Sequence, residues 1–185
     1  MVFIRTKKLK KKSGNIYTYA YLVENKWKKR AKGRKKSRQK VKAYLGRVYN
    51  TDKKSDIDFL ESLSIENINK YIDEKSKKDI IIDLVKYELL KHGFDEVGGL
   101  VSNGEIFFDL DKVEFSVLEG LKRKPGIVLS LNEGFMCKET IKRLTHFYVE
   151  GTEEEIGYKF AKAFVEAGID VPKEIFIGLF GKLFK

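Results

Sequence analysis

A basic stretch over residues 26–42 constrains this chain more than any other feature. It holds eleven Lys or Arg and no acid. Cations at this density repel one another unless an anion neutralises them. In its second half, Lys36, Arg38, Lys40 and Lys42 recur with the two-residue period of a β-strand. We therefore expect a basic loop over residues 26–35, then a strand with one cationic face that suits a polyanion.

The charge is distributed unevenly along the chain. Residues 1–50 carry eighteen Lys or Arg and a single acid, Glu24, which is a net charge of +17. The remaining 135 residues carry twenty bases and twenty-six acids, a net charge of −6. Solubility of a small domain needs a net charge of only about 2 to 8. The basic end therefore indicates a partner such as nucleic acid or an anionic surface.

The rest of the composition favours a folded, cytoplasmic protein. Hydrophobic residues make up 42% of the chain, enough for a core. The single cysteine, Cys137, excludes an intrachain disulfide and a thiolate metal cluster. No signal-peptide h-region and no apolar run of membrane-spanning length is present, so we expect no membrane partner. The high charged fraction, 35%, is typical of proteins from hot environments.

The first fifty residues predict a three-stranded antiparallel meander with strands near residues 2–6, 16–24 and 36–49. In the second strand, alternation places Tyr17, Tyr19, Tyr21 and Val23 on one face and Ile16, Ala20 and Leu22 on the other. In the third strand, the same rule places Val41, Ala43 and Leu45 opposite the cations.

Beyond residue 50 the apolar period changes from two to about 3.6 residues, which favours helices. We expect helices near residues 57–63, 67–73, 76–92, 138–149, 153–167 and 173–184, with strands near 105–117 and 127–131. The predicted fold class is α+β: an N-terminal three-stranded antiparallel β-meander plus a mixed domain with a small sheet and four to six helices. The predicted regions are a basic, β-rich nucleic-acid-binding unit over 1–50 and a mixed α+β domain with a helical C-terminus over 51–185.

The leading functional hypothesis is nucleic-acid binding, DNA more than RNA, mainly through phosphate contacts and without a cofactor. Lys and Arg attract phosphates irrespective of sequence, and aromatic side chains among them can stack on bases. The predicted contact residues are Lys28, Lys29, Arg30, Arg34, Lys36, Arg38, Lys40, Lys42, Arg47, Tyr19, Tyr21 and Trp27.

One family resemblance supports DNA. The tyrosine strand 17–25, the basic loop and the segment 38–47, which reads Arg-Gln-Lys-Val-Lys-Ala-Tyr-Leu-Gly-Arg, resemble the N-terminal segment of a group of DDE-type insertion-sequence transposases. The resemblance covers residues 1–47, about a quarter of the chain. In that group the segment is thought to help hold transposon-end DNA. The resemblance therefore implies a DNA role for the matching bases Arg38, Lys40, Lys42 and Arg47.

A second hypothesis is a Mg²⁺- or Mn²⁺-dependent nuclease or transposase-derived enzyme. Asp109 and Asp111 would point the same way on a strand, and carboxylate oxygens are the ligands that Mg²⁺ prefers. The transposase resemblance implies a ribonuclease H-like fold, which uses such a carboxylate set. Further carboxylates would have to come from Asp83, Asp95, Glu105, Glu119 or Glu133. An ordinary turn between two strands explains the Asp109–Lys112 sequence equally simply.

Two further interpretations concern partners. The C-terminal helices carry too few bases for a recognition helix, so we expect core packing or a contact between copies of the chain in a homo-oligomer. Alternatively, the basic end could bind an acidic protein.

His92 is expected at a helix C-terminus, and His146 lacks a second His one turn on, so neither indicates a metal site. Cys137 is expected to be an unreactive thiol.

Overall fold

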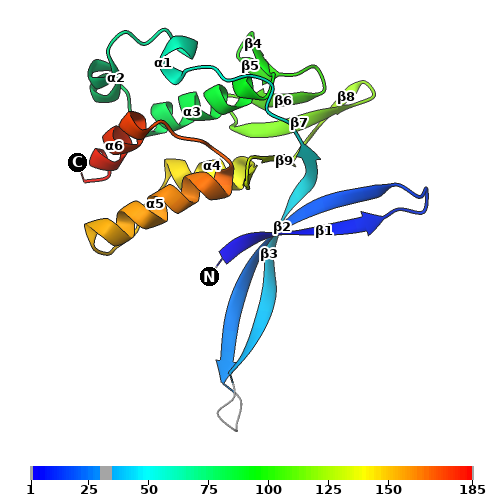
Figure 1. The fold of residues 1–185 in the computed structure, drawn as a ribbon. Helices are drawn as coiled ribbons and strands as arrows, with labels where there is room; N and C mark the ends of the chain where they lie inside the picture. Colours follow the sequence, from blue (N-terminus) through cyan, green and yellow to red (C-terminus); the bar gives the residue numbers. More distant parts are fainter. Residues whose placement is uncertain (1, 30–34, 185) are drawn as a thin grey trace.

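The computed structural model describes residues 2–29 and 35–184, without the side chains of residues 27–29 and 35–37. Within them the chain forms two five-stranded sheets and six helices, so the predicted α+β class is confirmed. Figure 1 shows the helices and the smaller sheet gathered in one body, with two long β-hairpins extending from it in different directions.

The larger sheet contains the predicted meander. Its strands are ordered β1 (Val2–Lys10), β2 (Ile16–Lys29), β3 (Lys35–Asn50), β9 (Ile127–Leu131) and β10 (Gly134–Met136). The first three are antiparallel, as predicted, whereas β3 pairs with β9 in parallel. The sheet therefore includes strands from both of the regions, 1–50 and 51–185, that the sequence suggests.

The predicted loop over residues 26–35 is too long. Strand β2 continues to Lys29 and β3 begins at Lys35, so part of the expected loop is hydrogen-bonded β-structure. Likewise, β1 continues past the expected residue 6 to Lys10. Cross-strand pairing explains these extensions, because a charged strand without an apolar face can still form its ladder beside a partner.

The smaller sheet is an antiparallel meander in chain order. Its strands are β4 (Asp95–Val97), β5 (Leu100–Ser102), β6 (Ile106–Asp109), β7 (Glu114–Glu119) and β8 (Lys122–Pro125). The expected strand 105–117 is thus a hairpin of β6 and β7 with a turn at residues 110–113.

Six helices complete the body: α1 (Phe59–Ser62), α2 (Ile68–Glu74), α3 (Lys77–Lys91), α4 (Lys138–Thr145), α5 (Glu153–Ala167) and α6 (Lys173–Gly181). The expected start signals are present: the hydroxyls of Ser76 and Thr152 accept the backbone N–H of Asp79 and Glu155. Gly168 ends α5 with a left-handed φ of 72°. The helix expected to reach residue 149 ends at Thr145.

Most of the core lies in the body, where α3 and the smaller sheet pack with the phenylalanines of α5 and α6. A second, small cluster lies on the other face of the larger sheet, where Ala20 of β2 packs with Val128 and Cys137.

Close packing joins β3 to the body at Gly46, whose φ is +134°. A Cβ there would lie 1.9 Å from the carbonyl oxygen of Gly126. Only glycine therefore fits this joint.

Candidate nucleic-acid interface

The β2–β3 hairpin carries most of the predicted contact residues, and two β-bulges determine where they point. Its pairing runs from Tyr19 opposite Arg47 to Lys29 opposite Lys35. Leu45 and Lys42 are the extra residues at the two register shifts. Because the alternation of faces along β3 is reversed between the two bulges, the faces of Ala43 and Tyr44 follow from the pairing and cannot be read from the sequence pattern.

One face of this hairpin, here called the comb face, carries Lys26, Arg38, Lys40 and Lys42. Arg38 is opposite Lys26, and Lys40 is opposite Glu24, so these side chains lie on one side of the sheet. Lys42, at the bulge, lies on the same side, as its contact with Glu24 shows: its Nζ is 3.4 Å from a carboxylate oxygen of Glu24. The predicted row of cations is therefore present over its described members.

The expected apolar row of β3 is wrong in one respect. Val41 is opposite Val23, whereas Ala43 is opposite Leu22, so Val41 and Ala43 lie on different faces. Leu45 packs into the small cluster around Ala20. Ala43 and Leu45 thus share the side of the cations near the body, and the physical reason is the bulge at Lys42.

Glu24 is the single acid on the comb face, and it is shared by two cations. Its carboxylate lies 3.6 Å from Nζ of Lys26 and 3.4 Å from Nζ of Lys42. Partial loss of solvent opposes its ionisation, but the two lysines outweigh that effect and the pKa of Glu24 lies below its ordinary value. Arg38 and Lys40 are exposed, and among the described residues neither forms an ion pair.

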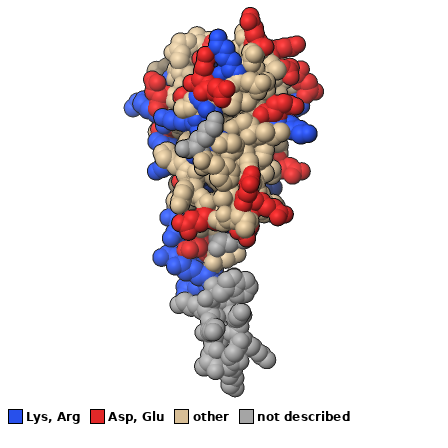
Figure 2. Space-filling model, turned by 90° about the vertical axis from the view of Figure 1, so that its left-hand side faces the viewer, with Lys and Arg blue, Asp and Glu red and all other residues tan. Residues whose placement is uncertain are grey.

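The comb face differs from the surface of the body. Figure 2 shows Lys and Arg side chains gathered directly above the grey atoms, where the β2–β3 hairpin leaves the body. On the visible face of the body, acids and bases are interspersed. The body therefore balances its charges locally, and the hairpin does not.

The opposite face of the meander, here called the tyrosine face, carries Tyr17, Tyr19, Tyr21 and Tyr44. Its residues form cross-strand ranks: Lys7, Tyr19 and Arg47 make one, and Arg5, Tyr21 and Tyr44 the next. Each rank thus combines a tyrosine of β2 with at least one cation. The predicted tyrosine row exists, but it lies on the face away from the comb.

A groove of about 430 Å³ opens on the tyrosine face. It is lined by Arg5, Lys7, Tyr21, Val23, Gln39 and Val41. A side-chain hydrogen bond from Arg5 to Gln39 crosses it from β1 to β3. Arg5 and Lys7 therefore lie beside aromatic and aliphatic side chains in one concave site.

Arg47 occupies a different position from the other predicted bases. Its guanidinium lies 4.0 Å from the ring centroid of Tyr17 and 4.7 Å from that of Tyr49. Cation–π contact with two rings holds the side chain at the inner end of the tyrosine face. Arg47 therefore lies across the sheet from Arg38, Lys40 and Lys42, with which the family resemblance grouped it.

Several predicted contact residues cannot be placed. Arg30 and Arg34 lie outside the described residues, as do the side chains of Trp27, Lys28, Lys29 and Lys36. The backbone of Trp27 is paired with Ser37, and that of Lys28 with Lys36.

Sequence reasoning missed Arg5, Lys7 and Tyr44 as parts of one surface. Alternation along β1 could have placed Arg5 and Lys7 on the same face, since they are two residues apart. Nothing local indicates that Tyr44 faces Tyr21, because that register depends on the bulge at Leu45.

The two carboxylates proposed for metal binding lie at a turn. Asp109 ends β6, and Asp111 is exposed in the turn before β7, so they do not share a strand face as expected. Oδ1 of Asp109 accepts the backbone N–H of Lys112 at 2.9 Å and that of Asp111 at 3.1 Å. These backbone hydrogen bonds, with the ammonium of Lys112, hold the pKa of Asp109 below its ordinary value. The geometry is that of an Asx turn.

The other candidate carboxylates do not converge on Asp109. Asp83 accepts hydrogen bonds from the Tyr71 hydroxyl at 2.8 Å and from Nζ of Lys75 at 2.6 Å. Glu119 pairs with Lys124, and this contact lowers the pKa of Glu119. In the described part of the chain, no group of three or more His, Cys, Asp or Glu side chains is arranged to hold a metal ion.

A buried polar cluster lies in the body, around Glu88 of α3. Its Oε1 accepts the side-chain amide of Asn132 at 2.9 Å, and its Oε2 accepts the backbone N–H of Asp170 at 3.1 Å. Nζ of Lys91, itself buried, is 3.3 Å from the same carboxylate. Glu88 thus ties α3 to the β9–β10 turn and to the segment between α5 and α6.

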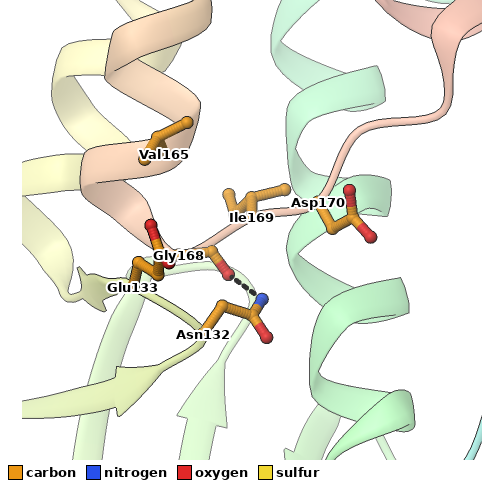
Figure 3. Close-up of a pocket in the computed structure, with 6 residues that line it drawn as sticks. All are labelled: Asn132, Glu133, Val165, Gly168, Ile169 and Asp170. Carbon is orange, nitrogen blue, oxygen red and sulfur yellow. Dashed lines mark hydrogen bonds between the residues drawn. The ribbon is translucent and has the colours of Figure 1, made fainter.

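A pocket of about 280 Å³ lies beside this cluster (Figure 3). Asn132, Glu133, Val165, Gly168, Ile169 and Asp170 line it. The amide of Asn132 also donates to the carbonyl of Gly168 at 2.9 Å, as Figure 3 shows. The central polar side chain of the pocket is therefore engaged within the chain, where the end of α5 meets the β9–β10 turn.

The histidines and the cysteine take structural places. Nδ1 of His92, at the C-terminal cap of α3, is 3.1 Å from the carbonyl oxygen of Thr51. Nδ1 of His146 is 3.1 Å from the carbonyl of Lys142 at the end of α4. Cys137 is buried, and burial raises the pKa of its thiol. An unreactive thiol is expected for such a group.

The C-terminal helices bury most of their aromatic surface. Phe160 is packed 5.0 Å from Phe164 and 5.7 Å from Phe176, measured between ring centroids. Tyr158, Val165, Ile177 and Phe184 remain exposed. These helices therefore contribute to the core, and a contact between copies of the chain stays a prediction.

No helix among the described residues combines the length and apolar character needed to cross a bilayer. Comparison of the chain with protein-family models, with curated proteins and with solved structures gave no match.

Proposed function

We propose that this protein binds DNA through contacts between the comb face and the phosphate backbone. The observation that carries the proposal is the pair of exposed cations Arg38 and Lys40, for which the described residues provide no acid. They lie on a hairpin that extends away from the helices (Figure 1). A cation placed there contributes nothing to the core, and an anionic partner removes its repulsion from its neighbours.

The spacing of the comb face supports a phosphate backbone as the partner. Side chains on one face of a strand recur about every 6.6–6.8 Å, twice the rise per residue. Arg38, Lys40 and Lys42 form a row along β3, and Lys26 stands beside Arg38 on the paired strand β2. A row of this kind suits a charged polymer better than it suits a single anionic group. DNA is preferred to RNA because the resemblance of residues 1–47 concerns DNA.

Salt dependence tests this proposal. Each phosphate neutralised on duplex DNA changes the slope of log affinity against log salt by about −0.9. We expect Arg38→Ala/Lys40→Ala to reduce that slope by about two on any duplex sequence, because two phosphate contacts are lost. Fluorescence anisotropy of a labelled duplex over a range of salt concentrations measures it.

The matched control is Lys78→Ala/Lys159→Ala, which removes two exposed cations from the body. It should leave the slope unchanged while giving the same change in net charge. Equal slopes for the wild type and the hairpin variant would contradict the proposal. So would an equal reduction of the slope in the two double variants.

A further inference from the structure

The tyrosine face has an open, aromatic surface that takes no part in the proposed phosphate contacts of the comb face. Tyr44 is 58% exposed and Val41 is 59% exposed. The ring centroid of Tyr44 lies 5.5 Å from that of Tyr21, with the planes inclined at 56°. At this angle the two rings do not cover each other's faces. Aromatic ring surface therefore remains available to a planar ligand.

Cations border these rings on the β1 side. Arg5 is directly across from Tyr21, and Lys7 is directly across from Tyr19, on the neighbouring strand β1. Nζ of Lys11 lies 5.7 Å from the ring of Tyr19. A ligand that places flat apolar groups on the tyrosines would therefore bring its anionic groups beside ammonium and guanidinium groups.

The phenol of Tyr44 adds no negative charge to this surface. Partial loss of solvent around its hydroxyl, together with the neighbouring phenols of Tyr19 and Tyr21, raises its pKa above the ordinary value, although the residue as a whole is largely exposed. The Tyr44 hydroxyl therefore stays un-ionised at neutral pH, and it does not repel phosphate. Glu105 and Glu119 act at the Tyr49 end of the face, where they add to the effect of burial in raising the pKa of Tyr49. The cationic part of the surface therefore lies further out, around Arg5 and Lys7.

Duplex DNA cannot stack its base faces on this surface. Its bases are stacked on one another, and only their edges are presented in the grooves. Unpaired bases expose their faces, and an aromatic row beside cations is the arrangement that binds single strands with little regard to sequence. Each base stacked on an aromatic side chain contributes roughly 5- to 150-fold in affinity.

We propose that the tyrosine face binds an unpaired stretch of DNA, with bases stacked on Tyr21 and Tyr44 and phosphates held by Arg5 and Lys7. This inference rests on the proposed DNA-binding function and assigns the second face a ligand of its own. The protein then holds duplex DNA on one side of the meander and an unpaired strand on the other.

Tyr44 provides the test, because its side chain is exposed and its loss leaves the core intact. Binding of the full chain to labelled oligothymidylate and to a duplex of equal length is measured by anisotropy at one salt concentration. Tyr44→Ala should weaken oligothymidylate binding by roughly 5- to 150-fold and duplex binding by less than about twofold. Tyr44→Phe, which keeps the ring, should retain both affinities. So should Tyr158→Ala, which removes a tyrosine that is 70% exposed on α5.

The outcomes separate this inference from the proposed function. Unchanged oligothymidylate binding in Tyr44→Ala, or an equal loss on both ligands, overturns the role of the tyrosine face. Arg38→Ala/Lys40→Ala should instead weaken duplex binding, and its failure to do so overturns the proposed function. Because the two variants lie on opposite faces, either result can be obtained without the other.

Discussion

The body and the β2–β3 hairpin use charged residues in opposite ways. In the body, Glu88 is fully buried and contacts Lys91, Asn132 and the backbone of Asp170. On the hairpin, Lys26, Arg38, Lys40 and Lys42 lie at the surface, and the one acid among them, Glu24, pairs with Lys26 and Lys42. Buried charges need partners within the fold because desolvation is costly, whereas exposed charges lose little without them. The first set therefore maintains the fold, and the second is available to a ligand.

The largest expected effect follows from removing the buried acid. Glu88→Ala removes the buried partner of the Lys91 ammonium and leaves it only the exposed carboxylate of Asp170, 3.5 Å away, so the free energy of unfolding should fall by about 3–5 kcal/mol. Urea-induced unfolding measures the loss. Glu66→Ala, which removes an exposed acid from the same body, should change stability by less than about 0.5 kcal/mol. Similar losses in the two variants would mean that the buried pair does not stabilise the body.

The joint between the two regions should be the next most sensitive site. In Gly46→Ala the new Cβ would meet the carbonyl of Gly126, and the backbone would be strained at a φ of +134°. The strain alone costs about 1–3 kcal/mol, and displacement of Gly126 adds to it. Gly14→Ala, at a φ of +87° with open space around it, carries backbone strain without a clash. Thermal unfolding of both variants should show the greater loss for Gly46→Ala, and equal losses would exclude close packing as the cause.

A smaller effect is expected for Glu24→Gln. The change removes the acid that occupies Lys26 and Lys42, so duplex DNA should bind a few-fold more tightly. Anisotropy at low salt detects this. Unchanged or weaker binding would indicate that these lysines do not face the phosphates.

The same variant gives a pH test. Because the folded-state pKa of Glu24 lies below its ordinary value of 4.5, its ion pairs stabilise the fold above that value. The contribution is lost as the pH falls through the lowered folded-state pKa. The melting temperatures of the wild type and Glu24→Gln should therefore differ at neutral pH and converge in acid. A constant difference across this range would assign the effect to something other than the carboxylate charge.

The smallest effect concerns the stability of the hairpin variant itself. Arg38→Ala/Lys40→Ala removes exposed cations without partners in the described structure, so the free energy of unfolding should change by no more than about 0.5 kcal/mol. Urea-induced unfolding, run beside Glu88→Ala, provides the direct comparison. A marked loss of stability would contradict the division of roles between the two regions.

Local sequence was enough for the elements with strong periodicity. Alternation predicted β2 and β3, and the Ser76–Asp79 and Thr152–Glu155 pairs marked the starts of α3 and α5. Capping and alternation act over three or four residues, so they can be read without knowledge of the fold. The shared face of Arg38 and Lys40 belongs to this class, because it depends only on the pleat of one strand.

The rest depended on contacts between distant residues. The bulges at Lys42 and Leu45 exist only in the pairing of β2 with β3, and they put Tyr44 on the tyrosine face and Ala43 on the comb face. The rank of Arg5, Tyr21 and Tyr44 joins three strands, and no segment contains that register. Likewise, the burial of Glu88 required the β9–β10 turn and the segment after α5 to meet α3. The sequence alone thus determined which strands carry the cations and the tyrosines. Only the tertiary structure decided which faces they share, because register and burial are set by long-range pairing.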